Sequence, residues 1–332
     1  MNRQILNWLL KTLLAGIAAF VLLCLFCALW YKVPVHYTNP DGATEYKYEP
    51  NTFYSRGVEG FAMGRTNSDG FPELMDYAPG DRVDVLLLGS SHLEGYGVPP
   101  KDNAAAVLNR LFGGEKTVYS IAMAGHTFPY CAKHLEKALE VYRPQYAVIE
   151  LASLSYNPAA MDAAADGTLP DIPSHAGGFV TLLQKLPFLR HMYNKYFNRG
   201  NDVVKAAAVM ETEVSKDAFE ASLARLLEKL GAVSGAHGVK TILVHVPTVV
   251  PDAEGRAVPE VKPGERESFR RLSEENGLVF LDLTDRFVSA LEEDHELLFG
   301  FANTAPGHGH INSRGHAVFA GAVYELLESG ED

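Results

Sequence analysis

The chain has 332 residues and carries 41 acidic against 29 basic side chains, so its formal net charge is −12. A hydrophobic fraction of 47%, with 18 Pro and 29 Gly, excludes a disordered, collagen-like or coiled-coil protein and leaves enough apolar material for one large domain or two modest ones. The acidic balance without a Lys/Arg-rich run argues against a nucleic-acid partner, and three cysteines cannot form a disulfide framework.

Residues 12–31 form an uncharged apolar stretch between Lys11 and Lys32. About 20 helical residues span the hydrocarbon core of a bilayer, so this stretch predicts a transmembrane anchor with the lipid bilayer as its partner. A cleaved signal peptide is the alternative, but the stretch ends in bulky residues instead of a small-residue cleavage site. The N-terminus, Arg3 and Lys11 outweigh Lys32, which predicts a cytoplasmic tail at residues 1–11. We therefore expect a single-pass protein of the cell membrane whose main domain lies outside the cytoplasm.

Residues 32–80 are rich in Tyr, Pro, Asn and Gly, which predicts a juxtamembrane segment of short strands and turns. Residues 81–330 then alternate continuous apolar runs with amphipathic stretches, except for an insertion at about 156–208. Runs that are apolar on both faces suit the interior of a parallel sheet. The pattern predicts an α/β domain with a flavodoxin-like, three-layer α/β/α arrangement of about five parallel strands. The expected strands are Val83–Leu88, Val118–Met123, Tyr146–Leu151, Thr241–Val246 and Leu278–Leu283, and the expected helices are Asn103–Phe112, Tyr130–Tyr142, Ala218–Leu230, Glu265–Glu275 and Ser313–Leu327.

Ser91 follows the first expected strand of the sheet. A serine at the tip of a strand-to-helix turn exposes its hydroxyl at the carboxyl edge of the sheet, where the next helix offers backbone amides to a developing oxyanion. Ser91 and Glu94 also fit a capping box, a pattern that stabilises a helix and needs no function. On this turn alone, both interpretations stay open.

Two further positions favour the functional interpretation. Gly125 follows the second expected strand, where its backbone N–H could approach the same point, and His310 directly precedes the last expected helix. A hydroxyl is a poor nucleophile until a base removes its proton, so a Ser–His pair is what acyl transfer requires. We therefore expect Ser91 as nucleophile, His310 as general base, and the amides of Ser91 and Gly125 as oxyanion donors.

These segments resemble the conserved blocks of the SGNH/GDSL hydrolases, in particular membrane-anchored bacterial members. GSSHLEGYGV is similar to the nucleophile block with Ser91 in the nucleophile's place, AMAGH to the second block with Gly125 as oxyanion donor, and GHINSRGH to the last block with His310 as base. The resemblance covers about residues 60–328. It implies the SGNH hydrolase fold and ester chemistry that needs no cofactor.

The chain departs from the oxyanion pattern of this family. Ser90 stands where the family usually carries Asp, and the third block lacks its Asn. Asn157 is the nearest substitute donor, and Ser153 or Ser155 could donate instead. Loss of one such donor costs about 3–4 kcal/mol of transition-state stabilisation in well-studied enzymes.

A second departure concerns the carboxylate that fixes the imidazole. The family's Asp three residues before the histidine is Gly307 here. Without that carboxylate a triad can lose about 10⁴-fold in rate. A backbone carbonyl, or a carboxylate elsewhere such as Glu150 or Asp282 on the expected strands, could orient His310 instead, although the sequence favours a structural role for both carboxylates.

The remaining histidines near these blocks are candidates for the substrate pocket. His92 and His126 each follow a proposed site residue, and His308 lies two before His310, a spacing that points both side chains the same way in an extended segment. No Asp, Glu or Cys joins them at ligand spacing, so the sequence predicts no metal site.

Taken together, these features predict a serine esterase that acts through an acyl-enzyme on O-acyl esters. The substrate class expected from the anchored position is acylated cell-envelope carbohydrate, or a small ester. Two alternatives stay open: an O-acyltransferase, or a non-catalytic binding or assembly component of an envelope-polymer modification system. Either would have a membrane O-acyltransferase as a natural partner.

Overall fold

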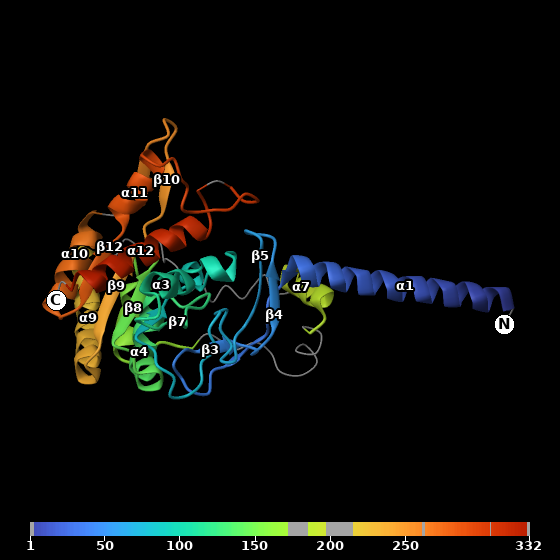
Figure 1. Cartoon of the computed structure of the whole chain (residues 1–332), viewed down its shortest axis with the longest axis horizontal. Coiled ribbons are helices and arrows are strands. Elements are labelled where there is room, and N and C mark those ends of the chain that lie inside the picture. The colour runs from blue at the N-terminus through green and yellow to red at the C-terminus, as the bar shows by residue number, and fades with distance from the viewer. Residues whose placement is uncertain (1–2, 172–184, 197–214, 261–262, 306, 331–332) are drawn as a thin grey trace.

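A computed structural model describes residues 3–171, 185–196, 215–260, 263–305 and 307–330. An α/β body carries one long helix that projects from it (Figure 1). Of the insertion expected at 156–208, residues 156–171 and 185–196 are described, and they contain α5 (Pro158–Ala165) and α7 (Pro187–Tyr196); the rest lies outside the described residues.

The body is built on a five-stranded parallel sheet with the order β12-β9-β8-β6-β7. Renumbered along the chain, this order is 2-1-3-4-5, the flavodoxin-like arrangement, and the expected fold class is confirmed. Carboxyl ends of all five strands therefore meet at one edge, where ligands bind in such sheets. The strands are β6 (Val85–Leu88), β7 (Val118–Ser120), β8 (Tyr146–Leu151), β9 (Lys240–His245) and β12 (Val279–Asp282).

Each face of the sheet is covered by its own layer of helices. Alternate residues of a strand point to opposite faces, so Ile149 of β8 enters one core and Val148 enters the other. The first core contains side chains of α4 (Phe128–Tyr142), α5, α9 (Lys216–His237) and α10 (Pro263–Glu275), and the second those of α3 (Ala104–Phe112), α11 (Thr284–Glu292) and α12 (Ser313–Ser329). The five helices expected from the sequence are confirmed, four of them within two residues at each end, and α9 continues seven residues past the expected end at Leu230. α11 was not expected, because its nine residues offer only two turns of amphipathic pattern.

Residues 31–65 form short antiparallel strands. One sheet has the order β1-β4-β5, and β2 pairs with β3 in a separate hairpin. Buried aromatic residues of this segment, among them Tyr48 and Tyr54, pack into the same core as α4 and β8. The remaining short elements are β1 (Tyr31–Lys32), β2 (His36–Thr38), β3 (Tyr46–Tyr48), β4 (Phe53–Arg56), β5 (Ala62–Arg65), α2 (Ser91–Glu94), η1 (Pro100–Asp102), β10 (Val249–Pro251) and β11 (Ala257–Pro259).

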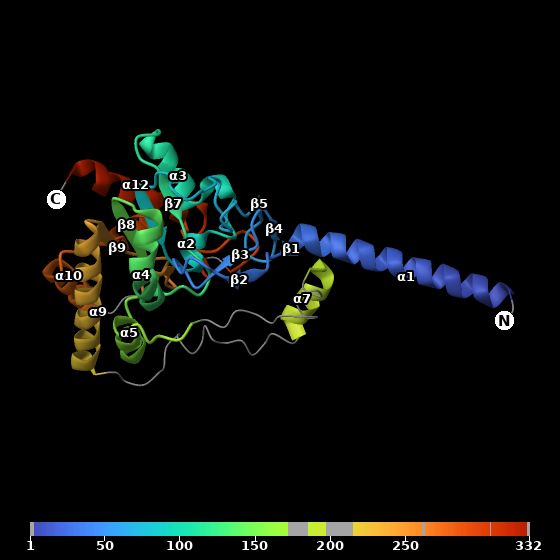
Figure 2. The same ribbon diagram turned by 90° about the horizontal axis from the view of Figure 1, so that it is seen from below.

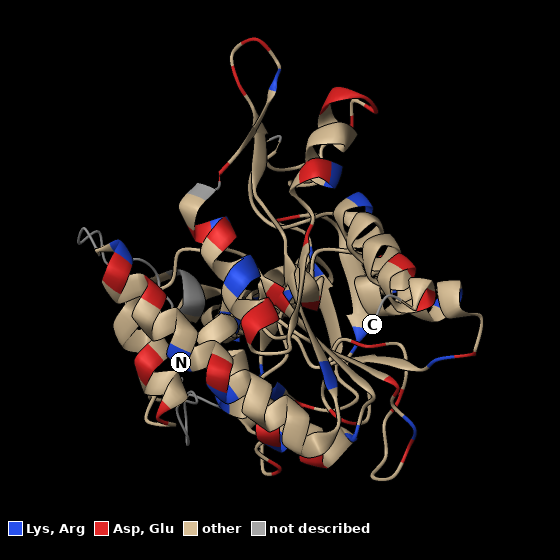
Figure 3. Cartoon of the chain, turned by 90° about the vertical axis from the view of Figure 1, so that its left-hand side faces the viewer, with Lys and Arg blue, Asp and Glu red and all other residues tan. Residues whose placement is uncertain are grey.

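The projecting helix is α1 (Arg3–Trp30), which is long and apolar enough to cross a membrane. It begins earlier than the expected span of 12–31 and continues directly into β1. α7 lies beside the end of α1 that meets the body (Figure 2), where the rings of Phe20 and Phe188 have centroids 6.1 Å apart. On the side of the body opposite to α1, acidic and basic residues are interspersed (Figure 3).

Candidate active site

In the turn after β6, one serine caps the following helix and the next serine contacts His310. Ser90, in extended conformation, is the N-cap of α2, and its hydroxyl accepts a hydrogen bond from the backbone N–H of His92 at 3.3 Å. Ser91 is the first helical residue, and its Oγ lies 2.8 Å from Nε2 of His310. The cap expected at Ser91 thus belongs to its neighbour, and the Ser91 hydroxyl is left to pair with the imidazole.

Glu150 and Asp282, the two carboxylates considered for His310, have other partners. Glu150 at the end of β8 accepts the Ser90 backbone N–H at 2.7 Å and the Ser90 hydroxyl at 3.1 Å. Burial raises the pKa of Glu150 to about 7. Asp282 bonds His245 Nδ1 at 3.1 Å. Glu150 therefore supports the turn that carries Ser91. Both carboxylates have the structural role that the sequence favoured for them, and neither is the partner of His310.

The carboxylate that faces His310 is Glu59, in the loop between β4 and β5. Its Oε1 lies 2.7 Å from Nδ1 of His310 and accepts the backbone N–H of the same residue at 2.8 Å. Its other oxygen accepts from Arg56 at 2.7 Å. The hydrogen bond from His310 is the main reason that the pKa of Glu59 falls to about 2. Ser91, His310 and Glu59 thus form a continuous hydrogen-bonded chain.

This chain of contacts determines which imidazole nitrogen carries the proton. An ionised carboxylate only accepts, so Nδ1 of His310 must donate to Glu59. In the neutral imidazole Nε2 is then the acceptor, and the Ser91 hydroxyl donates to it. This is the protonation pattern in which a histidine can remove a proton from a serine.

The loop of Glu59 is held against the segment that precedes His310. Asn303 accepts the backbone N–H of Gly60 at 2.9 Å and donates to the carbonyls of Gly57 at 2.8 Å and Gly60 at 3.0 Å. Gly309 has a φ of +98°, and a Cβ there would lie 2.4 Å from Glu59 Oε1. Glycine is therefore required for the carboxylate to approach His310 so closely. Glu59 and His310 are 251 residues apart, and no motif in the sequence links them.

Gly125 lies in a turn that buried side chains tie to α2. The carboxylate of Glu94 accepts the Ala124 backbone N–H and the hydroxyl of Tyr48, the latter at 2.6 Å, and burial raises its pKa to about 7. The hydroxyl of Tyr46 donates to the Ala124 carbonyl. The N–H of Gly125 points away from that carbonyl, because the two belong to one trans peptide. Gly125 itself has a φ of +90°.

The substitute oxyanion donors expected in the third block have local structural roles. Asn157 is the N-cap of α5, where its side-chain oxygen accepts from the Ala159 N–H at 2.9 Å. The hydroxyl of Ser153 accepts from the Ser155 N–H, and the hydroxyl of Ser155 donates to Glu265. Among the described residues, no hydrogen bond joins any of the three to Ser91 or His310. Asn157 as an oxyanion donor stays a prediction.

The three histidines expected in the pocket differ in their surroundings. His92 packs beside His310, with ring centroids 5.0 Å apart, and its Nδ1 accepts the Ile311 N–H at 3.3 Å. Burial, aided by the neighbouring His310, lowers the pKa of His92 to about 4. His126 is buried against Tyr46, and burial lowers its pKa to about 3. His308 is exposed. Of the three, His92 is the one that contacts the Ser91–His310 pair.

A small depression connects these elements at the surface. Side chains of β4, of the loop after α2 and of the segment around His310 line it. The lining residues are Arg56, Glu59, Ser91, Gly95, Tyr96, Gly97, Phe301, His310 and Ile311. His126 and His308 are not among them.

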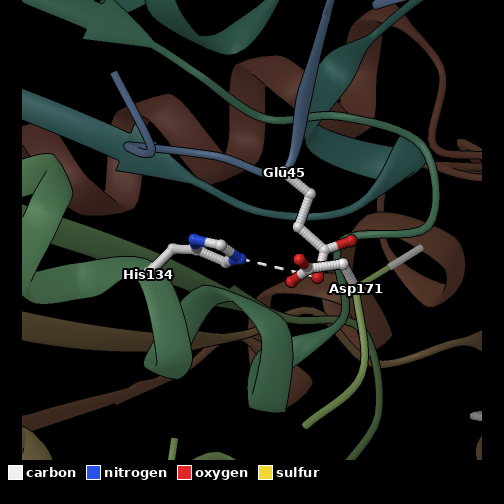
Figure 4. A group of neighbouring side chains, drawn as sticks. All are labelled: Glu45, His134 and Asp171. Atoms are coloured by element: carbon white, nitrogen blue, oxygen red, sulfur yellow. Dashed lines mark hydrogen bonds and ion pairs between the residues drawn. The ribbon is translucent and has the colours of Figure 1, made fainter. Parts of the chain in front are cut away.

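A separate group of possible metal ligands includes Glu45, which lies in the loop between β2 and β3. Ligand atoms of Glu45, His134 and Asp171 lie within 4.8 Å of one another (Figure 4). The ammonium of Lys133 lies 3.7 Å from Glu45 and pairs with Asp171. These four side chains already form an ion-paired cluster in which the lysine occupies the place of a cation.

Comparison with known proteins finds similarity in solved structures alone. No protein-family model matches the chain, and no curated protein matches it in sequence. A psychrotrophic esterase from Pseudoalteromonas sp. is 15% identical with a TM-score of 0.39, covering 74% of this chain and 97% of its own. An α/β-hydrolase enzyme from the metagenome of Lake Arreo is 14% identical with a TM-score of 0.42, at 77% and 99% coverage. An acetyl xylan esterase is 11% identical with a TM-score of 0.42, at 74% and 100% coverage. The fold assignment stands on the strand order described above.

Proposed function

We propose that this protein is a membrane-anchored serine esterase of the SGNH/GDSL type, in which Ser91, His310 and Glu59 act as a catalytic triad. The observation that supports it is the pair of short contacts on the imidazole, 2.8 Å to Ser91 Oγ and 2.7 Å to Glu59 Oε1. Three segments distant in sequence converge to form them. A nucleophile, a base and an orienting carboxylate in that order are the elements of acyl transfer.

In the proposed reaction, Ser91 Oγ attacks the ester carbonyl while its proton passes to Nε2 of His310. The charge of Glu59 stabilises the imidazolium that forms. The backbone amides of Ser91 and Gly125 bind the oxyanion. His310 then gives its proton to the leaving alkoxide, which leaves an acyl group on Ser91. Water then attacks the acyl-enzyme while its proton passes to Nε2 of His310. The bond between the acyl carbon and Ser91 Oγ breaks, His310 returns the proton to Ser91 Oγ, and the carboxylic acid is released. No cofactor takes part in this scheme.

Retention of α1 as an uncleaved anchor is part of the proposal. The last turn of α1 makes contacts that belong to the body: the Ser55 hydroxyl donates to the Ala28 carbonyl at 2.7 Å. Gly57 lies so close that a Cβ there would be 2.8 Å from the Trp30 carbonyl oxygen. Cleavage after α1 would remove these partners. The basic residues before the span outnumber those directly after it, which supports a position of the body outside the cytoplasm. An enzyme there would meet acylated envelope carbohydrate, which we propose as the substrate class.

The proposal is tested with the full chain in detergent, a fluorophosphonate probe and p-nitrophenyl acetate. We expect the wild type to be labelled and to hydrolyse the ester, and Ser91→Ala to lose both activities. Labelling that persists in Ser91→Ala would refute Ser91 as the nucleophile. Absence of labelling in the wild type would favour the binding or assembly component instead. Transfer of the acetyl group to an added sugar in preference to water would identify an O-acyltransferase.

A further inference from the structure

The small β1-β4-β5 sheet has two faces of different character. Two residues that lie directly opposite each other in an antiparallel pair have their side chains on the same face of the sheet. Residues two apart along one strand also share a face. Ser55 lies opposite Lys32 and Met63, and Phe53 and Arg65 continue the same face. The hydroxyl of Ser55 reaches the last turn of α1 at Ala28, so this face is the one directed toward α1.

The face toward α1 has the composition of a lipid–water interface. Phe53 and Met63 are each 39% exposed although both are apolar, and the ammonium of Lys32 lies over the Phe53 ring. Arg65 is exposed on the same face. Aromatic rings and basic side chains with apolar stems are favoured at the level of lipid headgroups. Exposed apolar side chains in such a group mark an interaction site.

The loop between β4 and β5 extends this surface to the anchor helix. Phe61 is 60% exposed, and its ring centroid lies 6.4 Å from that of Trp30, the last residue of α1. Val58, beside Glu59, is 48% exposed. Figures 1 and 2 both show β4 and β5 beside the end of α1 that meets the body. The exposed apolar side chains are therefore continuous with the end of the candidate span.

The opposite face of the same sheet belongs to the active site. Tyr54 is buried and stacks on Tyr96 with ring centroids 4.5 Å apart. Arg56, which pairs in register with Tyr31, binds Glu59 and lines the depression beside Ser91. One layer of backbone thus separates the surface next to α1 from the residues of the triad.

We propose that the outer face of the β1-β4-β5 sheet, with Phe61, rests in the lipid–water interface. The site then acts on acyl esters held at the bilayer surface, such as those on lipid-linked molecules. This inference rests on the proposed esterase function and on α1 as the anchor. Its occupant is the bilayer itself, because the exposed apolar residues adjoin the helix that enters it.

The position of the sheet is tested with the full chain in nanodiscs of phosphatidylethanolamine and phosphatidylglycerol. A fluorophore is attached to Met63→Cys or, as a control, to Val258→Cys, in a chain whose Cys24, Cys27 and Cys131 are replaced by Ala. Val258 is 44% exposed on the β10–β11 hairpin. Spin labels on the lipid headgroups should quench the fluorescence of the fluorophore at position 63 and should not change the fluorescence of the one at position 258. Equal quenching at the two positions would overturn the inference, whatever the result of the activity measurements.

The substrate class is tested by the ratio of two activities in the same nanodiscs. Met63→Glu should lower turnover of p-nitrophenyl dodecanoate, which partitions into the bilayer, about ten-fold relative to turnover of p-nitrophenyl acetate. Val258→Glu should leave the ratio unchanged. A Met63→Glu ratio equal to that of the wild type would overturn the inference. If the wild type shows no Ser91-dependent turnover of either ester, the proposed function fails, and the quenching experiment alone decides where the sheet lies.

Discussion

One carboxylate oxygen of Glu59 accepts hydrogen bonds from both the backbone N–H and the imidazole of His310. This double contact fixes the position of His310 as well as the orientation of its ring. A side chain at position 309, which is glycine, would collide with this oxygen. The second oxygen is neutralised by Arg56. Orientation of the imidazole therefore depends on a residue in the juxtamembrane segment, far from the motif that contains the base.

We predict that Glu59→Gln lowers kcat/KM for p-nitrophenyl acetate by about 10²–10⁴-fold, because the amide no longer stabilises the imidazolium and can impose the wrong tautomer. Glu150→Gln is the matched control. Its amide oxygen can still accept the Ser90 N–H, so we expect it to keep activity within about ten-fold of the wild type. The reverse order of the two variants would identify Glu150 as the functional carboxylate.

Glu73 provides a prediction on pH. It is buried, and burial raises its pKa from the ordinary 4.5 to about 8. Between these two values the folded chain binds more protons at this site than the unfolded chain, so its contribution to stability is present at low pH and is lost as the pH rises to about 8.

We predict that Glu73→Gln stabilises the protein at pH 8.5, by on the order of 2 kcal/mol, and has little effect at pH 4.5, because the variant stays neutral at both. Thermal unfolding followed by circular dichroism at the two pH values measures the difference. Glu115→Gln, at an exposed site, should show no such pH dependence. A gain of equal size at both pH values would contradict the linkage to ionisation.

At the scale of elements, the junction between α1, β1 and β4 connects the candidate span to the triad. β1 follows α1 without a linker, Tyr31 pairs with Arg56, and Gly57 packs against the Trp30 backbone and ring. Gly57 has space for no side chain, whereas Gly235 in α9 has open space around it. An added methyl group would therefore clash at position 57 and meet no neighbour at position 235.

We predict that Gly57→Ala destabilises the full chain by about 1–3 kcal/mol, because the added methyl group overpacks the junction. Gly235→Ala should stabilise it by about 0.5–1 kcal/mol through higher helix propensity. Chemical unfolding of both variants in detergent micelles gives the two values. A Gly57→Ala variant as stable as the wild type would show that the junction can accommodate a methyl group and is not closely packed.

For the whole molecule, the juxtamembrane residues are part of the α/β body that carries the proposed triad. Their aromatic side chains pack into the core on one face of the sheet, and their β4–β5 loop supplies Glu59. A boundary drawn after the span at residue 32 separates β1 from the sheet to which it belongs. If the proposed triad is correct, the placement of the domain boundary therefore bears on the position of Glu59.

We predict that a chain beginning at Val33 has lower esterase activity than one beginning at Ala28, by several-fold, because loss of β1 leaves one edge of β4 unpaired beside Arg56 and Glu59, while the other edge still pairs with β5. Activity of both chains on p-nitrophenyl acetate in the same detergent measures the effect. Restoration of activity by a few added residues at the N-terminus would confirm pairing as the cause. Equal activity of the two chains would show that β1 is dispensable for the position of Glu59.

The amino-acid sequence by itself determined the five strands, most of the helices and the topological class. These depend on local periodicity: continuous apolar runs bury on both faces of a parallel sheet, and amphipathic stretches cover it. It also singled out Ser91 and His310, because a serine after a strand and a histidine before a helix at the carboxyl edge of one sheet are brought near by the topology alone.

Only the tertiary structure decided which carboxylate meets His310. Glu59 lies in a turn with no motif, and its distance to His310 depends on how a peripheral β-sheet packs against loops more than 200 residues away. Glu150 and Asp282 lie on predicted strands of the same sheet, and nothing in their local pattern reveals that they are bonded to Ser90 and His245. Local periodicity is encoded within a few neighbouring residues, whereas the partner of a side chain depends on the summed packing of the whole chain.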